Sequence, residues 1–279
     1  MIAIGQHHTL TILRSTGVGL FLGNPETEDV ILLPNKYVPQ NYQVGDELCV
    51  FVYLDQQERP VATTLEPYIH LNDFALLRVN YTNQLGAFLD WGLEKDLFVP
   101  FKEQARKMEQ GKRYLVYLYL DDKTQRLVAS SKTNQFLSNE NLTVEKGQEV
   151  DLIVSHTTEL GLNVIVNQQH KGLIYKDEIF DERIRLGDRI KGYVKAIRAD
   201  HKLDISLQKE GFENVEESAQ IILDELKSKK GFLRLNDKSH PDDIKVLLNM
   251  SKKTFKKAVG TLYRERLIEI KEDGIYLID

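Results

Sequence analysis

The side chains best suited to chemistry in this sequence are aromatic rings that alternate with lysines and arginines along short apolar segments. Tyr117 and Tyr119 lie between the cations Lys112 and Lys123, and Arg126 follows shortly after. Such rings can stack on unpaired bases, each worth about 1–3 kcal/mol, while the cations contact phosphates. The pattern is typical of a site for a single-stranded nucleic acid.

The motifs of the common enzyme classes are absent from the sequence. It has no Walker phosphate loop, no Gly-x-Ser-x-Gly motif and no His-Glu-x-x-His motif. The histidines are scattered, and the one close pair, His7-His8, lacks the spacing of a metal site. Asp55, Asp121 and Asp200 recur at equivalent strand ends, which favours a turn role over acid–base catalysis. We predict a non-enzymatic protein without catalytic residues, metal or cofactor; a paired-carboxylate enzyme is the alternative.

The bulk composition predicts several folded domains in a reducing compartment. The chain has 279 residues, of which 42% are hydrophobic and 28% charged, enough for two to four cores. Cys49 is the single cysteine, so no internal disulfide can form. The first ten residues lack signal-peptide features, and no apolar run approaches the ~18 residues of a membrane span. We expect a cytoplasmic protein without a membrane partner.

The net charge of −5 limits where a nucleic acid can bind. Nucleic-acid-binding domains are usually basic, yet residues 1–66 carry 3 basic and 8 acidic residues. Residues 215–279 are nearly balanced, with 13 basic and 12 acidic residues. Any such site must therefore be a local patch.

One strand pattern recurs three times with a period of about seventy residues. Each copy begins with a glycine among strand-forming residues, at Gly17, Gly86 and Gly161, and continues with a short apolar strand. A longer strand led by glycine and ending in aspartate follows, and its apolar residues alternate as a half-buried strand requires. Five or so short strands per ~70 residues predict a small closed or nearly closed barrel.

The second copy resembles the S1-type RNA-binding domain, which is an OB-fold barrel. The segment from Leu85 to Asp90, with Phe88 inside it, is similar to that family's aromatic-Gly-Ala-Phe-Val strand. The sequence departs from the S1 pattern at two of five binding positions, because Leu85 replaces an aromatic residue and Val99 the usual histidine. By the same pattern the first copy is the most divergent.

The S1 resemblance implies binding residues on two of the three barrels. On the second barrel they are Phe88, Tyr117, Tyr119, Lys112, Lys123 and Arg126. On the third they are Tyr175 at the histidine position, Tyr193, Lys195, Arg198 and Lys202, with Asn163 at the Phe position. The alternative is that these rings pack against a neighbouring barrel. The first barrel has few cations and an apolar outward face of Cys49, Phe51 and Tyr53, so we expect it to pack on another domain or a partner.

After Gly211 the spacing of apolar residues changes to that of helices. Residues 214–229 form a predicted amphipathic helix that Gly231 ends, before a short strand over 232–235. A helix begins at Pro241, Ser251 caps another, and an Asp-Gly turn joins a final hairpin. This order of elements is that of a winged helix.

The last predicted helix carries the strongest basic patch of the chain. Contact with phosphates is the functional interpretation, either as a recognition helix or as support for RNA from the barrels. A solvated helix face is the alternative. The basic residues proposed for binding are Lys252, Lys253, Lys256, Lys257 and Arg264.

Three such barrels followed by a winged helix resemble the conserved virulence factor B family of bacterial RNA-binding regulators, also called YitL-like. Residues 86–100 look like that family's signature. The resemblance implies RNA binding and post-transcriptional regulation. We predict single-stranded RNA, mRNA included, as the partner, with the ribosome or the RNA-degradation machinery as further partners. The predicted domains are 1–66, 67–136, 137–212 and 213–279.

Two other functions are consistent with the same residues. The first is a transcription factor that binds DNA through residues 252–266, with the barrels as an interaction arm. The second is a protein-interaction scaffold associated with the ribosome or an RNase, which the negative net charge favours.

Overall fold

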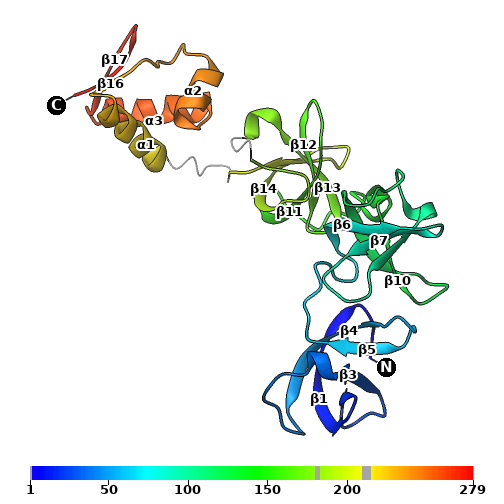
Figure 1. Ribbon diagram of the computed structural model, residues 1–279. Helices are drawn as coiled ribbons and strands as arrows, with labels where there is room; N and C mark the ends of the chain where they lie inside the picture. Colours follow the sequence, from blue (N-terminus) through cyan, green and yellow to red (C-terminus); the bar gives the residue numbers. More distant parts are fainter. Residues whose placement is uncertain (1, 180–182, 209–214, 279) are drawn as a thin grey trace. The chain divides into compact units, whose positions relative to one another are not determined.

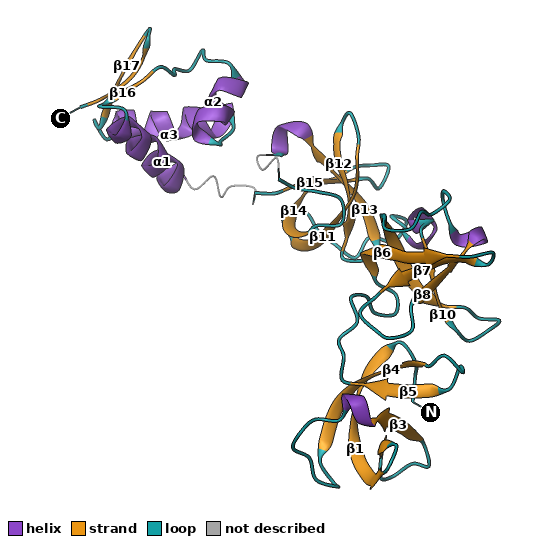
Figure 2. Ribbon diagram, in the orientation of Figure 1, coloured by secondary structure: helices purple, strands orange, loops and turns teal. Residues whose placement is uncertain are grey.

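The chain folds into three five-stranded barrel-like sheets followed by a winged helix, which confirms the predicted fold class (Figures 1 and 2). This computed structural model describes residues 2–179, 183–208 and 215–278, without the side chains of 215–217. Two compact units are present, residues 1–137 and 138–279. The predicted boundary between 212 and 213 lies outside the described residues, and the boundaries near 66 and 136 stay predictions.

The first unit contains the first two barrels. The first barrel closes in the order β1-β2-β3-β5-β4, and the second sheet has the same strand order but is open between β10 and β8. Strands of the first barrel are β1 (Gln6–Thr16), β2 (Gly19–Gly23), β3 (Val30–Pro34), β4 (Glu47–Leu54) and β5 (Pro60–Thr63). Strands of the second are β6 (Phe74–Thr82), β7 (Gly86–Asp90), β8 (Leu97–Pro100), β9 (Arg113–Leu120) and β10 (Leu127–Ser130). Short 3-10 helices are η1 (Asn35–Tyr37), η2 (Phe101–Glu103) and η3 (Thr133–Phe136).

The second unit contains a closed barrel and the winged helix. The barrel consists of β11 (Glu149–Thr157), β12 (Gly161–Val166), β13 (His170–Tyr175), η4 (Lys176–Glu178), β14 (Arg189–Ile197) and β15 (Leu203–Ser206). The winged helix consists of α1 (Val215–Ser228), β16 (Phe232–Leu233), α2 (Pro241–Leu248), α3 (Lys252–Arg264), β17 (Ile268–Lys271) and β18 (Gly274–Leu277). Within the described ranges, no helix has the length and apolarity needed to cross a membrane.

The repeated glycine stands where the next strand's backbone leaves no room for a side chain. A Cβ at Gly86 would lie 2.3 Å from the Val99 carbonyl oxygen, and one at Gly161 would lie 1.9 Å from that of Ile174. The equivalent residue of the first barrel is Gly19, whose Cβ would lie 2.1 Å from the Leu33 oxygen. Gly17, which the sequence pattern indicated, was the wrong equivalent, because a Cβ there meets nothing within 4 Å.

The long strands of the second and third barrels bury every second residue, as their alternation predicts, whereas β4 of the first barrel buries residues on both faces. In β9, Tyr114, Val116 and Leu118 are buried in the barrel core. The aspartate that ends this strand forms the predicted turn: the Asp121 carboxylate accepts hydrogen bonds from the backbone amides of Lys123 and Thr124, at 3.1 and 2.8 Å. The Thr124 bonds lower the pKa of Asp121, which is consistent with a structural carboxylate.

The apolar outward face of the first barrel packs against the second barrel. Phe51 and Tyr53 are buried in one cluster with Ile69 and Trp91. The Trp91 ring meets both edge to face, at centroid distances of 5.9 and 6.3 Å. This confirms the expected packing role for Phe51 and Tyr53, whereas Cys49 is exposed.

Caps predicted from the sequence bound the helices of the winged helix. The Ser251 hydroxyl accepts a hydrogen bond from the Thr254 amide at 3.0 Å, so α3 begins at Lys252. The Gly231 amide donates to the Leu226 carbonyl oxygen at 2.7 Å, which ends α1. The predicted inward side chain of Val215 lies outside the described side chains. The final hairpin, β17 and β18, pairs as predicted.

We expect Gly19→Ala to lower the free energy of unfolding of the first unit by about 2 kcal/mol or more, because the new Cβ meets a backbone carbonyl. Gly17→Ala, two residues away, should change it by less than about 0.5 kcal/mol. Urea denaturation followed by Trp91 fluorescence measures both, since Trp91 is the chain's single tryptophan and packs inside this unit. Equal midpoints for the two variants would contradict this role of the glycine.

Candidate nucleic-acid interface

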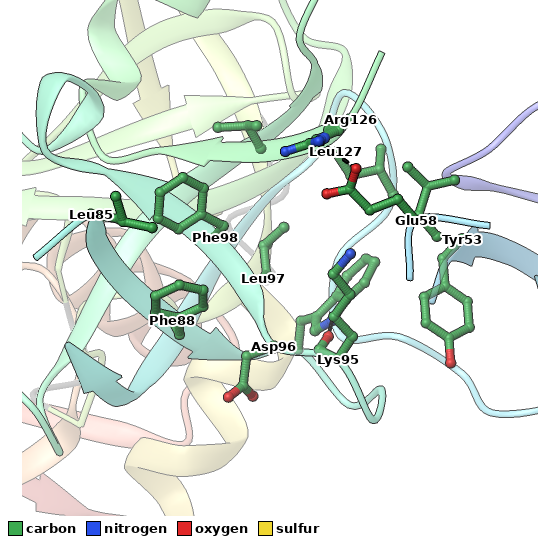
Figure 3. Close-up of a pocket in the computed structure, with 13 residues that line it drawn as sticks. Tyr53, Glu58, Leu85, Phe88, Lys95, Asp96, Leu97, Phe98, Arg126 and Leu127 are labelled. Carbon is green, nitrogen blue, oxygen red and sulfur yellow. Dashed lines mark hydrogen bonds and ion pairs between the residues drawn. The ribbon is translucent and has the colours of Figure 1, made fainter. Parts of the chain in front are cut away.

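An aromatic pocket of about 230 Å³ opens in the first unit, beside the predicted binding residues Phe88 and Arg126. Figure 3 shows Phe88 and Phe98 on one side and the Arg126–Glu58 pair across from them. The second barrel supplies most of the wall, and Tyr53, Leu54 and Glu58 of the first barrel complete it. We call this site the aromatic pocket.

Three rings from adjacent strands pack into an aromatic wall, of which Phe88 and Phe98 line the pocket and Tyr81 lies beside it. Phe88 of β7 stacks on Tyr81 of β6, with centroids 4.5 Å apart and planes 9° apart, and lies 5.0 Å from Phe98 of β8. Phe88 and Phe98 are cross-strand partners, so both project from the outer face of the sheet. Val99, which the sequence aligned with the S1 histidine, is fully buried, and Phe98 is the residue that pairs with Phe88.

The charged groups at the aromatic pocket are engaged by neighbouring acceptors and donors. Arg126 pairs with Glu58, and the Lys95 ammonium donates to the Asp55 carbonyl oxygen at 2.8 Å. Burial lowers the pKa of Lys95. Burial also raises the pKa of Asp96, although the Asn80 amide donates to it at 2.8 Å. The pocket therefore combines ring faces with two cations, Lys95 and Arg126, and two carboxylates, Glu58 and Asp96.

Two other predicted binding rings, Tyr117 and Tyr119, pack against Phe136 of the same unit. Phe136 of η3 stacks on Tyr117 at 4.1 Å and lies 5.4 Å from Tyr119. Burial, with nearby carboxylates, raises the pKa of Tyr119 to about 12. Lys112 pairs with Glu109 at 2.8 Å, and Lys123 is exposed. None of these four residues lines the aromatic pocket.

The predicted cations of the third barrel form ion pairs with its own acids. Arg198 hydrogen-bonds to Tyr175 and contacts Asp204 at 2.9 Å, and Lys195 pairs with Glu178. The other two predicted residues of this barrel also have acidic partners. Lys202 pairs with Asp200 at 2.7 Å, and the Tyr193 hydroxyl donates to Glu149 at 3.0 Å.

The third barrel lacks the ring pair found on the second. By strand register, the partner of Asn163 at the Phe position is Leu173. Tyr175 pairs with Gly161 and projects from the same outer face, two residues along β13. An aromatic wall like that of the second barrel therefore does not form here.

Helix α3 presents a basic stripe on the side opposite its buried face. Phe255, Ala258 and Leu262 face the core of the winged helix. The exposed stripe consists of Lys253, Lys256, Lys257 and Arg264, which fall within about 100° on a helical wheel. Lys252 is half-buried and donates to the Ser239 carbonyl oxygen at 2.8 Å, so it differs from the others.

Among the residues that sequence reasoning missed are Phe98 and Lys95, which line the aromatic pocket, and Tyr81 beside it. Phe98 could have been found from the alternation of its own strand, because Leu97 and Val99 are apolar and face inward. Tyr81 lies on β6, a strand for which the repeat pattern contained no marker. Lys95 has no sequence signal, since only the fold brings it to Asp55 of the first barrel.

The barrels and the winged helix define a nucleic-acid-binding type of protein, which is not an enzyme class. A model of the CvfB-like winged helix domain matches residues 220–277, and a model of the S1 domain matches residues 4–65. The S1 match falls on the first barrel, the copy that the motif comparison ranked as most divergent. The chain belongs to the family of conserved virulence factor B and YitL, as its similarity to YitL shows.

Relatives match nearly the whole chain. YitL of Bacillus subtilis is 31% identical over 93% of this chain and 89% of its own length. Conserved virulence factor B of Staphylococcus epidermidis is 26% identical over 98% and 94%. Among solved structures, a multidomain protein with nucleic acid binding domains from Streptococcus pneumoniae is 28% identical, covering 99% of this chain and 98% of its own, with a TM-score of 0.41.

We expect Phe136→Ala to lower the pKa of Tyr119 from about 12 toward its ordinary value near 10. The reason is that the Tyr119 side chain becomes more exposed to water when the Phe136 ring is removed. Neutral Tyr119 contributes stability below pH ~10, which is lost as pH rises toward 12. Carbon-13 NMR of ζ-labelled tyrosine measures the titration. Phe98→Ala, which removes a ring that packs on Phe88 instead, is the control. An unchanged Tyr119 titration in Phe136→Ala would contradict the prediction.

Proposed function

We propose that this protein is a cytoplasmic post-transcriptional regulator that binds single-stranded RNA without catalysing a reaction. The observation that carries the proposal is the aromatic pocket, in which stacked rings and cations of an S1-type barrel lie together. Proteins that bind single strands combine such rings with backbone-tracking cations. The family membership supports the same function.

Bases would stack on the wall formed by Tyr81, Phe88 and Phe98. Tyr81 is 44% exposed, so part of this residue is open to solvent. A phosphate would replace Glu58 at Arg126, and the cost is small because an exposed ion pair contributes only about 0–1 kcal/mol. The Asp96 carboxylate, at the same pocket, can accept a hydrogen bond from a base amino group.

The basic stripe of α3 would add phosphate contacts. We propose mRNA as the ligand class and the ribosome or the RNA-degradation machinery as further partners. Of the predicted binding residues, those that lie at the aromatic pocket or on the basic stripe are Phe88, Arg126, Lys253, Lys256, Lys257 and Arg264. Duplex DNA bound by α3 is the second candidate, because the stripe lies on the helix that would enter a groove.

We expect Phe98→Ala to weaken binding of a labelled single-stranded RNA about 5- to 150-fold, the equivalent of one lost stacking contact. Tyr68→Ala removes a ring that is 62% exposed in the same unit but outside the pocket, and it should leave the affinity unchanged. Fluorescence anisotropy measures both affinities.

The same assay tests the proposal as a whole. Absence of salt-sensitive binding by the unsubstituted protein at about 10 μM would reject it, because phosphate contacts make affinity depend on salt. Competition with unlabelled duplex DNA distinguishes the second candidate. If the duplex displaces RNA more effectively than the same RNA unlabelled, DNA is the preferred ligand.

We expect the double variant Lys256→Gln/Lys257→Gln to reduce the slope of log affinity against log salt by about 1.4, because each lost phosphate contact removes about 0.7 for a single strand. Lys227→Gln with Lys230→Gln makes the same charge change near the end of α1 and serves as the control. An equal loss of slope in both double variants would show that overall charge, and not the α3 stripe, determines binding.

A further inference from the structure

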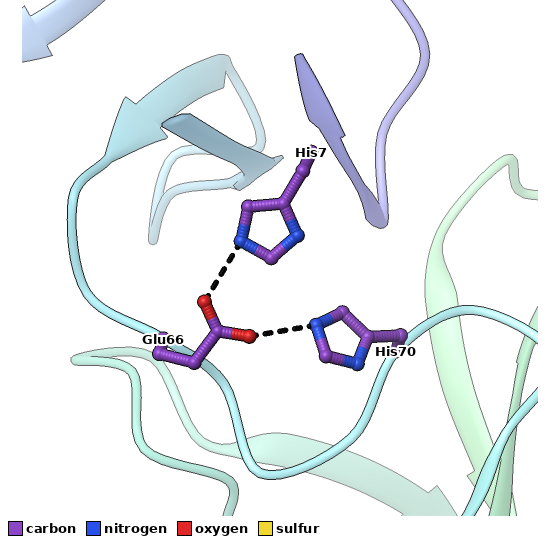
Figure 4. Close-up of side chains that lie close together, drawn as sticks. All are labelled: His7, Glu66 and His70. Atoms are coloured by element: carbon purple, nitrogen blue, oxygen red, sulfur yellow. Dashed lines mark hydrogen bonds and ion pairs between the residues drawn. The ribbon is translucent and has the colours of Figure 1, made fainter. Parts of the chain in front are cut away.

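Two histidines and a glutamate from separate parts of the first unit converge on one point. His7 lies on β1, whereas Glu66 and His70 lie in the segment that connects β5 to β6. One Glu66 oxygen lies 3.0 Å from Nε2 of His7 and the other 3.0 Å from Nε2 of His70 (Figure 4). Their potential ligand atoms all lie within 4.8 Å of one another.

We propose that His7, Glu66 and His70 bind a divalent transition-metal ion, with Zn²⁺ as the first candidate. Two imidazole nitrogens with one carboxylate suit Zn²⁺ and its neighbours, whereas Ca²⁺ and Mg²⁺ require oxygen ligands. Zn²⁺ holds such atoms at about 2.0–2.2 Å, so tetrahedral neighbours lie about 3.4 Å apart. The two nitrogen–oxygen distances of 3.0 Å are already close to that spacing.

The backbone holds the ligands in place without an ion. The Leu71 amide donates to the Gly5 carbonyl oxygen at 3.3 Å, which ties the connecting segment to the start of the first barrel. The Tyr68 amide donates to the Trp91 carbonyl oxygen at 2.8 Å, which ties it to the second. Ile69, between these two anchors, is fully buried. These backbone contacts therefore hold Glu66 and His70 near His7 without an ion.

The surroundings of the rings also suit a metal site. The Phe51 ring lies 5.3 Å from His7 and 6.0 Å from His70, so an apolar wall backs both imidazoles. On the far side of its ring, Nδ1 of His70 lies 3.6 Å from Asp73, the kind of carboxylate partner that orients a ligating histidine. The Glu66 side chain is 68% exposed, which leaves room for water as a further ligand.

Bound metal would tie β1 of the first barrel to the segment that enters the second. Because an ion that binds only the folded state stabilises it, Zn²⁺ is expected to raise the thermal midpoint of this unit. Neither the aromatic pocket nor α3 supplies a ligand, so the inference is independent of RNA binding.

Isothermal titration of Zn²⁺ into the untagged, chelator-treated full-length chain near neutral pH tests the proposal. We expect one ion per chain, and at least about 10-fold weaker binding in each of His7→Ala, His70→Ala and Glu66→Gln. His8→Ala is the matched control, because the His8 ring contacts the Ala3 carbonyl oxygen instead and should keep the affinity of the unsubstituted chain. Co²⁺ in place of Zn²⁺ should give a visible absorption band that His8→Ala retains and His70→Ala loses.

Three outcomes would overturn the site. They are no stoichiometric binding of Zn²⁺, an affinity within twofold of the unsubstituted chain in both His7→Ala and His70→Ala, or an equal loss in His8→Ala. Glu66→Gln changes an exposed side chain, so it tests the site even if an alanine variant fails to fold. Trp91 fluorescence confirms that each metal-free variant is folded before titration.

Discussion

The edge-to-face packing of Phe51 and Tyr53 on Trp91 is the interaction on which the first unit depends. Without it, the outer face of β4 would expose two large rings to water. With it, Glu58 reaches the second barrel at Arg126 and completes the aromatic pocket. The same packing places the connecting segment beside β1, where the histidines meet Glu66. Both candidate sites therefore follow from one apolar contact.

The negative net charge is compatible with RNA binding because the charges are distributed unevenly. On the barrels, cations pair with nearby acids, as Arg126 does with Glu58 and Arg198 with Asp204. A phosphate that binds such a cation must replace its carboxylate partner. This exchange favours selectivity of binding over high affinity. On α3, four exposed cations lie on one face of the helix, which concentrates positive charge there.

Local sequence patterns predicted the strands and helices more reliably than they predicted which face of a strand each side chain occupies. The alternation of β9 and the cap at Ser251 followed from neighbouring residues, and both are as predicted. The motif alignment placed the S1 histidine at Val99, whereas the period of the strand points to Phe98 as the neighbour of Phe88. Gly17 was chosen over Gly19 because only the backbone of β3 shows which glycine is required.

Short-range spacing by itself determined the three barrels, the winged helix and the basic face of α3, because strand period, turns and caps are set within a few residues. Only the tertiary structure decided which rings are available. Phe136 covers Tyr117, and Tyr81 and Phe98 join Phe88, through contacts that depend on how neighbouring elements pair and pack. His7 and His70 are 63 residues apart, so their meeting at Glu66 depends on how two barrels pack, which no local spacing encodes.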